Sequence, residues 1–402
     1  MAEARAVESA TVPARSVRAA WATRRWRTVA LLLCLWIPFA NAPAAADAAD
    51  VQGAADWRAL QADLARHLQV RGDARQQLVA AMLLAWPVAD DAPLVHQDAA
   101  AARLPEAQAI FARVRASTDD PWVLWIAATD CRFGDALCDR DGAIDALLRI
   151  EPDNAAVWLL ALDRAVRDAD RDAQLMALQG IAGSARYDQH FLTALRAWTD
   201  ASAAWPEVPG FERLVAREMT EDPDAVLDGE SLRALAGLHG LGAAMAFGFP
   251  RFSALTDLCL PEQIVGDDWR DACRGAAQVL VASDTLVATN VGLSVAYRLA
   301  TDDDARRALE QRRRQHNWMI GSIALLGFDG FDAEGVLDVD EAGAMIRRWR
   351  EATSELALIQ TLMREAGLPL VPPADYRAPG LTLAEREADR QARLSTTAGR
   401  PR

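Results

Sequence analysis

Apolar residues recur at helical spacing along nearly the whole chain, whereas runs that alternate apolar and polar residues are almost missing. An amphipathic helix buries positions three and four residues apart, while a half-buried strand buries every second position. The sequence therefore predicts an all-α fold. Three expected helices have clear start signals, because residues 153–154, 302–304 and 338–341 place acidic or amide side chains at a first turn.

The segment 121–205 shows signs of an internal repeat. Leu124, Trp158 and Leu192 follow one another at equal steps (158 − 124 = 192 − 158 = 34). Around the second step, apolar residues close a helix, an acidic turn with proline follows, and an aromatic residue stands in the next helix. The residues in this pattern are Leu147, Leu148, Glu151, Pro152, Asp153, Asn154 and Trp158.

This pattern resembles the tetratricopeptide repeat, whose unit is a helical hairpin of about 34 residues. Arg140, Leu162 and Ala165 depart from the family pattern. The resemblance implies stacked hairpins with a concave surface that holds a peptide or another protein, and it implies no enzymatic activity.

The character of the chain changes near residue 206, where the segment AAWPEVPG contains two prolines and a glycine. We expect a hinge there, between a tetratricopeptide-like array over 47–205 and a second, irregular helical block over 206–372. Residues 373–402 are polar and lack a stripe of apolar residues that could join a core. A disordered tail is expected there.

The first 46 residues have the three parts of an export signal. Arg24, Arg25 and Arg27 precede an apolar stretch at 28–39, and small residues follow at 44–46. The apolar stretch is shorter than the roughly 20 residues that span a bilayer as a helix, so removal is favoured over anchoring. We expect a signal peptide over 1–46 with cleavage near Ala46, a periplasmic or secreted protein, and no transmembrane segment in the mature chain.

The four cysteines beyond this signal form two pairs that are local in sequence. The expected disulfides join Cys131 to Cys138 and Cys259 to Cys273, because an even number of cysteines in an exported protein favours disulfides over metal or redox chemistry. Crossed pairing and free thiols are the alternatives. Residues seven apart on one helix are too distant for a disulfide, so the chain must turn between the first two cysteines.

Charge and composition exclude several classes of function. The chain has a formal net charge of −14 and no lysine. Such a surface is a poor partner for nucleic acid. Phosphate-loop nucleotide enzymes, Schiff-base chemistry and serine-lysine hydrolysis all need a lysine. The five histidines are not spaced as a helical metal pair, and no cofactor or metal is predicted.

The expected function is that of a protein-binding scaffold or adaptor in the cell envelope, with another envelope protein or a peptide as its partner. The candidate surface is the concave side of residues 121–205, where Trp122, Trp125 and Trp158 either line a groove or fill the space between helices. The alternative is a periplasmic hydrolase with a pocket between the two helical blocks, using carboxylates with His239 or His316. Nothing in the sequence nominates a catalytic, cofactor-binding or metal-binding residue.

Overall fold

The computed structural model describes residues 48–85, 94–129, 133–219, 227–245, 250–323, 338–378, 380 and 382–398. Within these ranges the protein is all-α, which confirms the predicted fold class, and the described residues make a single isolated β-bridge between Asn154 and Arg186. The predicted signal peptide lies outside the described residues. Among the residues described, no helix combines the length and apolar character that a membrane crossing needs.

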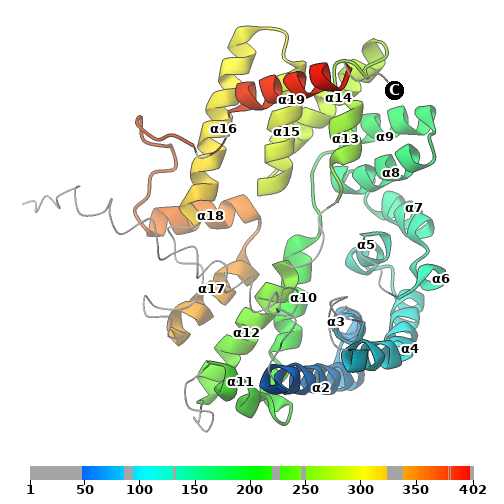
Figure 1. The fold of residues 1–402 in the computed structure, drawn as a ribbon, viewed down its shortest axis with the longest axis vertical. Coiled ribbons are helices and arrows are strands. Elements are labelled where there is room, and N and C mark those ends of the chain that lie inside the picture. Colours follow the sequence, from blue (N-terminus) through cyan, green and yellow to red (C-terminus); the bar gives the residue numbers. More distant parts are fainter. Residues whose placement is uncertain are drawn as a thin grey trace, which may run out of the picture.

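The helices of the first half of the chain follow an arc along one side of the molecule (Figure 1). They are α2 (Ala48–Arg71), α3 (Ala74–Leu84), α4 (Leu94–Ser117), α5 (Pro121–Thr129), α6 (Asp135–Cys138), α7 (Arg140–Ile150), α8 (Ala155–Arg167) and α9 (Arg171–Gly183). Neighbours along the chain pack together in this arc, as α3 does with α4, α5 with α7, and α8 with α9.

After α9 the chain turns back through the middle of the molecule before it builds the remaining helices (Figure 1). These are α10 (Phe191–Ser202), the short 3₁₀ helix η1 (Trp205–Glu207), α11 (Phe211–Met219), α12 (Gly229–Met245), α13 (Ser253–Leu258), α14 (Asp267–Val281), α15 (Leu286–Leu299), α16 (Asp303–Ile323), α17 (Val339–Glu351), α18 (Glu355–Glu365) and α19 (Leu383–Ala398).

The expected helix starts are present. Asn154 caps α8 by accepting the backbone N–H of Ala156, and Asp338 caps α17 by accepting that of Glu341. Asp302 accepts the N–H of Ala305 at the start of α16. These side chains satisfy backbone donors that have no partner within the helix.

The segment of the predicted hinge near residue 206 is anchored in the core by the side chain of Trp205. Trp205 is 1% exposed, and its ring stacks between Trp57 of α2 and Phe211 of α11, with 5.5 Å between centroids on each side. One cluster of buried residues runs from Leu60 to Leu358 and so includes both predicted blocks. The aromatic anchor at Trp205 therefore joins the two parts of the chain, and their separation into independent units stays a prediction.

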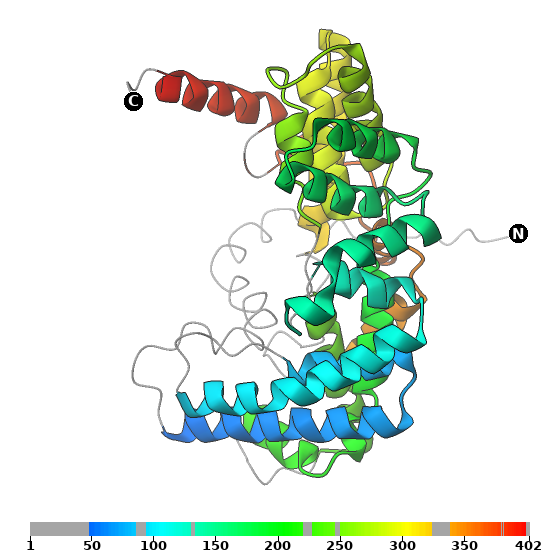
Figure 2. The ribbon, with the colours of Figure 1, turned by 90° about the vertical axis from the view of Figure 1, so that its right-hand side faces the viewer.

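The predicted disordered tail is wrong for residues 383–398, which form α19. Thr382 and Glu385 make reciprocal backbone caps, with Glu385 Oε2 accepting the Thr382 N–H at 2.8 Å and Thr382 Oγ1 accepting the Glu385 N–H at 3.1 Å. Leu383 is 3% exposed, and Arg390 forms ion pairs with Glu262 and Glu387. The helix extends away from the body beyond these contacts (Figure 2).

Close helix contacts depend on glycine at two crossings. A Cβ at Gly240 would lie 2.8 Å from the Trp198 carbonyl oxygen, where α12 crosses α10. A Cβ at Gly292 would lie 2.6 Å from the Val281 backbone nitrogen, where α15 crosses α14.

Substituting Gly292 by alanine is expected to lower the free energy of unfolding by about 2 kcal/mol, because backbone atoms of α14 must move to admit the methyl group. Gly343 in α17 is the matched control, since a Cβ there meets only the flexible end of Arg347. Gly343→Ala is expected to leave stability unchanged or to raise it by up to about 1 kcal/mol. Urea unfolding of both variants measures the difference, and equal midpoints would contradict the expected crowding at Gly292.

Candidate functional site

A cavity of about 690 Å³ lies where three distant segments of the chain meet. One wall comes from the turn between α9 and α10 and from the start of α10, the second from the end of α14 and the turn to α15, and the third from the start of α18. The lining residues are 184–189, 191–193, Arg196, 278–279, 282–285 and 353–355. A cavity of this volume is in the range of ligand-binding pockets.

The first wall is held by hydrogen bonds to the preceding turn of the arc. The Asn154 side chain donates to the Asp188 carbonyl oxygen at 2.8 Å and accepts the Asp188 N–H at 2.9 Å. The Ala155 N–H donates to the Arg186 carbonyl oxygen at 2.8 Å. These bonds hold the α9–α10 turn against the start of α8.

A buried carboxylate joins the same two turns. Glu151 accepts hydrogen bonds from His190 Nε2 at 3.1 Å and from Asn154 Nδ2 at 3.0 Å. Arg186 adds an ion pair to Glu151 at 3.0 Å. Burial by itself would raise the pKa of Glu151, but the partners, with His190 first, outweigh burial and lower that pKa to about 2.

The second and third walls hold each other by a reciprocal pair of bonds. The Leu286 N–H at the start of α15 donates to Glu355 Oε2 at 2.8 Å, and the Leu356 N–H at the start of α18 donates to the Asp284 carbonyl oxygen at 3.0 Å. Ser354 caps α18 by accepting the Ala357 N–H at 3.1 Å. The two helix starts are thereby positioned together at the cavity.

Arg196 ties the first wall to the segment that precedes α18. Its Nε donates to the Arg350 carbonyl oxygen at 2.9 Å, and its Nη2 donates to the Ala352 carbonyl oxygen at 2.7 Å. These acceptors are at the carboxyl end of α17, where a cation interacts favourably with the helix dipole. The guanidinium therefore has a structural role at the cavity wall.

Two carboxyl groups line the cavity, Asp284 on the second wall and Glu355 on the third. Burial, and then the neighbouring Asp284, raise the pKa of Glu355 above its ordinary value, although the bond from the Leu286 N–H opposes this rise. Asp284 is exposed and lines the same cavity. Asp284 and Glu355 are 71 residues apart in the sequence (355 − 284 = 71), so no local sequence motif predicts that they line the same cavity.

The three tryptophans that the sequence suggested for a groove lie elsewhere. Trp122 and Trp125 are 1% and 3% exposed and belong to the core around α5, so a groove lined by these two residues is wrong. Trp158 is half-buried, donates its ring N–H to the Pro152 carbonyl oxygen at 2.8 Å and packs over Gly180 of α9. These side chains fill space between helices, which was the alternative reading of their positions.

The two histidines suggested for a hydrolase are not on the cavity wall. His239 is enclosed by the Trp57 and Trp205 rings, with centroid distances of 4.8 and 5.7 Å, and burial lowers its pKa to about 4. His316 is buried in α16. Burial, with Arg313 nearby, lowers the pKa of His316 to about 4.

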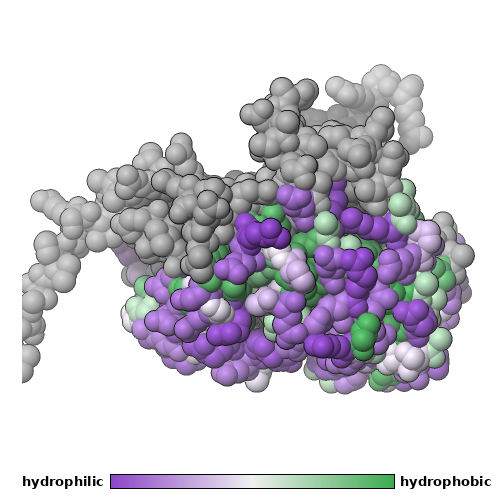
Figure 3. Space-filling model, turned by 90° about the horizontal axis from the view of Figure 1, so that it is seen from below, coloured by the Kyte–Doolittle hydropathy of each residue, from purple (hydrophilic) through white to green (hydrophobic). Residues whose placement is uncertain are grey.

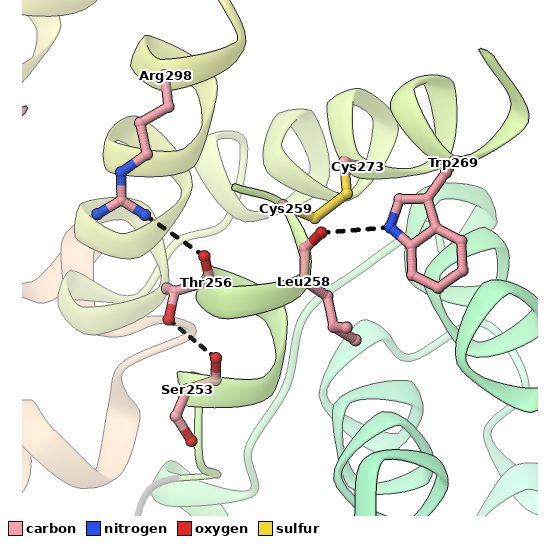
Figure 4. Close-up of a disulfide and its surroundings, with 7 residues drawn as sticks. All are labelled: Ser253, Thr256, Leu258, Cys259, Trp269, Cys273 and Arg298. Carbon is pink, nitrogen blue, oxygen red and sulfur yellow. Dashed lines mark hydrogen bonds between the residues drawn. A yellow bond between two sulfur atoms is a disulfide. The ribbon is translucent and has the colours of Figure 1, made fainter. Parts of the chain in front are cut away.

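The second predicted disulfide is confirmed, since Cys259 at the end of α13 is joined to Cys273 in α14 (Figure 4). The Trp269 ring N–H donates to the Leu258 carbonyl oxygen at 3.3 Å beside it. The partner predicted for Cys138, Cys131, lies outside the described residues. Across the described ranges, no group of three or more His, Cys, Asp or Glu side chains lies close enough to hold a metal ion.

The face of the molecule seen from below Figure 1 is largely hydrophilic, with hydrophobic side chains gathered mainly in its middle (Figure 3).

Comparison of the chain with protein-family models, with curated proteins and with solved structures gives no match. The cavity and its lining side chains are the features of this protein that bear on its function.

Proposed function

We propose that this protein is an exported, helical-repeat scaffold of the cell envelope that binds a partner polypeptide, and that the binding site is the cavity between the α9–α10 turn, α14 and α18. The observation that carries the proposal is the cavity of about 690 Å³. It is large enough for several residues of a bound chain. This cavity is not the concave surface that the sequence predicts as the binding site. Trp122 and Trp125, which were expected to line that surface, lie in the core.

The tetratricopeptide-like part of the proposal is supported by three equivalent turns. Asp120, Asn154 and Asp188 stand at equal steps (154 − 120 = 188 − 154 = 34). Each accepts the backbone N–H two residues ahead, at 2.9, 3.1 and 2.8 Å respectively. Asp120 and Asn154 stand directly before α5 and α8, whereas Asp188 accepts the N–H of the residue before α10. A side-chain turn that recurs at this period is consistent with a repeat of helical hairpins.

Export is supported by the Cys259–Cys273 disulfide, because such bonds form and persist in oxidising compartments. The arginines and apolar stretch of residues 24–46 have the composition of an export signal. Both features favour an address outside the cytoplasm.

Filling the cavity tests this site. Ala282 is exposed, lines the cavity and is the C-cap of α14, whereas Ala203 is exposed, lies outside the cavity lining and is the C-cap of α10. We expect Ala282→Trp to weaken binding of peptides selected from a random-peptide display library by at least about tenfold, and Ala203→Trp to leave it unchanged. Fluorescence anisotropy with the selected peptides measures both, and equal affinities would place binding elsewhere.

The second candidate is a hydrolase, which the carboxyl pair Asp284 and Glu355 favours over an enzyme built on His239 or His316. Two acids with different surroundings in one cavity are the arrangement used for general acid and base roles. This candidate requires turnover of ester, glycoside or peptide substrates that disappears in both Asp284→Asn and Glu355→Gln. Absence of turnover in the wild-type protein on all three substrate classes would rule against it.

A further inference from the structure

The positive charges on the cavity wall are already engaged by the protein itself. Arg186 forms ion pairs with Glu151 at 3.0 Å, Asp188 at 3.4 Å and Asp153 at 3.6 Å. Arg196 donates to two carbonyl oxygens at the end of α17. The charge of Arg186 is therefore compensated by three carboxylates, and Arg196 uses two of its donor nitrogens within the protein.

The negative charges are in the opposite situation. The Asp284 carboxylate has no ion pair or hydrogen bond with any described residue, and Glu355 accepts only one hydrogen bond there, from the Leu286 N–H. Burial, and then the neighbouring Asp284, raise the pKa of Glu355. The second and third walls therefore carry acids without a cationic partner among the described residues.

A further polar group on this wall has no partner. Thr285 follows Asp284 in the cavity lining, is only 8% exposed, and its Oγ1 has no hydrogen-bond partner among the described residues. A threonine at this N-cap position usually accepts the N–H of the second or third helical residue, but Thr285 makes no such bond to α15. A buried hydroxyl without a partner is costly, and a ligand donor would satisfy it.

Helix starts at the cavity do not make it an anion site. The starts of α10, α15 and α18 all lie on its wall, and such ends attract anions through free N–H groups. Here Asp188 accepts the His190 N–H, Glu355 accepts the Leu286 N–H, and Ser354 accepts the Ala357 N–H. At each of these starts an acidic or hydroxyl oxygen of the protein already accepts one of the N–H groups that would attract an anion.

We propose that the cavity receives a basic side chain of the bound polypeptide, with its ammonium or guanidinium group between Asp284 and Glu355 and within reach of Thr285. This inference rests on the proposed function and specifies its ligand. A cation supplies both the counter-charge and the N–H donors that this wall lacks. The formal net charge of −14 favours the approach of a basic partner over the whole surface.

The volume of the cavity leaves room for more than a small amine. An ammonium or guanidinium group fills a small part of about 690 Å³, so the remaining space is available to the residues that flank it. Spermidine has the same charged group without those flanking residues. A competition experiment with spermidine therefore separates the two sources of positive charge.

The test compares peptides selected by three proteins from a random-peptide display library. We expect peptides retained by the wild type to be enriched in arginine or lysine, and this enrichment to disappear with the double variant Asp284→Asn, Glu355→Gln. Glutamine at 355 keeps an acceptor for the Leu286 N–H, which preserves the fold of the wall. The control is Asp268→Asn, a change at an exposed acid of α14 outside the cavity, which should select the same basic peptides as the wild type.

A synthetic peptide from the selection then gives the size of the effect. Replacing its basic residue by glutamine should weaken binding to the wild type by about tenfold and should have no effect on binding to the double variant. Binding that depends on Ala282 but not on peptide charge would overturn this inference and leave the proposed function standing. Two results would contradict a polypeptide ligand altogether. One is that the wild type selects no peptide from the library, and the other is that spermidine fully displaces the bound peptide at a concentration equal to that of the peptide.

Discussion

Loss of the Cys259–Cys273 disulfide is expected to lower the free energy of unfolding by about 3 kcal/mol. The two cysteines are 14 residues apart, and the bond limits the conformations that this loop can adopt in the unfolded chain. Both cysteines are 0% exposed, so alanine is the suitable replacement, since serine would bury a hydroxyl group. The bond also joins the end of α13 to α14, which carries one wall of the cavity (Figure 4).

Urea unfolding of Cys259→Ala, Cys273→Ala beside the wild type measures this loss. Non-reducing peptide mapping of the wild type should recover a linked pair of peptides that contain residues 259 and 273. A double variant with the wild-type midpoint would show that the bond contributes nothing, and recovery of two free thiols in protein from its native compartment would remove the structural support for export.

Replacing Glu151 by alanine is expected to cost about 3 kcal/mol at neutral pH. Its side chain is 12% exposed and holds the α7–α8 turn to the α9–α10 turn through His190 and Arg186. Removing one member of a buried charged network leaves its partners without compensation, and the cost is larger than the net contribution of the pair. Because these turns carry the first wall of the cavity, peptide binding should weaken together with stability.

The same carboxylate predicts a specific loss of stability in acid. Its pKa is about 2 in the folded protein against an ordinary value of 4.5, so its stabilising contribution is complete above about pH 4.5 and disappears as the pH falls towards 2. Glu151→Gln should flatten this part of the pH dependence. Glu212→Gln, at an exposed acid in the first turn of α11, is the control and should retain the wild-type slope.

Unfolding midpoints in urea at a series of pH values between 7 and 2.5 measure the effect. An unaltered acid slope in Glu151→Gln would mean that other carboxyl groups carry the dependence. An effect of Glu212→Gln equal to that of Glu151→Gln would assign it to net charge instead of to the buried network.

Local patterns in the sequence predicted those features that depend on a few neighbouring residues. Asn154 and Asp338 were expected at helix starts and cap α8 and α17 there. Cys259 and Cys273 were expected to pair across a turn, and they do. Thr382 and Glu385 also have the spacing of a capping box, and this pattern predicts a helix start at α19 in place of a disordered tail.

Features that depend on contacts between distant segments were missed or misplaced. Trp122 and Trp125 have the same helical spacing whether they face a groove or a core, so their burial follows only from the helices that pack around α5. Trp205 directly precedes Pro206 in the segment that suggests a hinge, yet its ring is stacked between Trp57 and Phe211. Spacing indicates one face of a helix but not what covers that face.

The sequence by itself determined the all-α class, the starts of α8, α16 and α17 and the disulfide between α13 and α14, because each depends on residues that are close together in the chain, at most 14 apart for the disulfide. Only the tertiary structure decided where a ligand site lies. The cavity exists because the α9–α10 turn, the end of α14 and the start of α18 meet in space, and the unpaired acids Asp284 and Glu355 become neighbours only when the reciprocal backbone bonds of α15 and α18 bring them together.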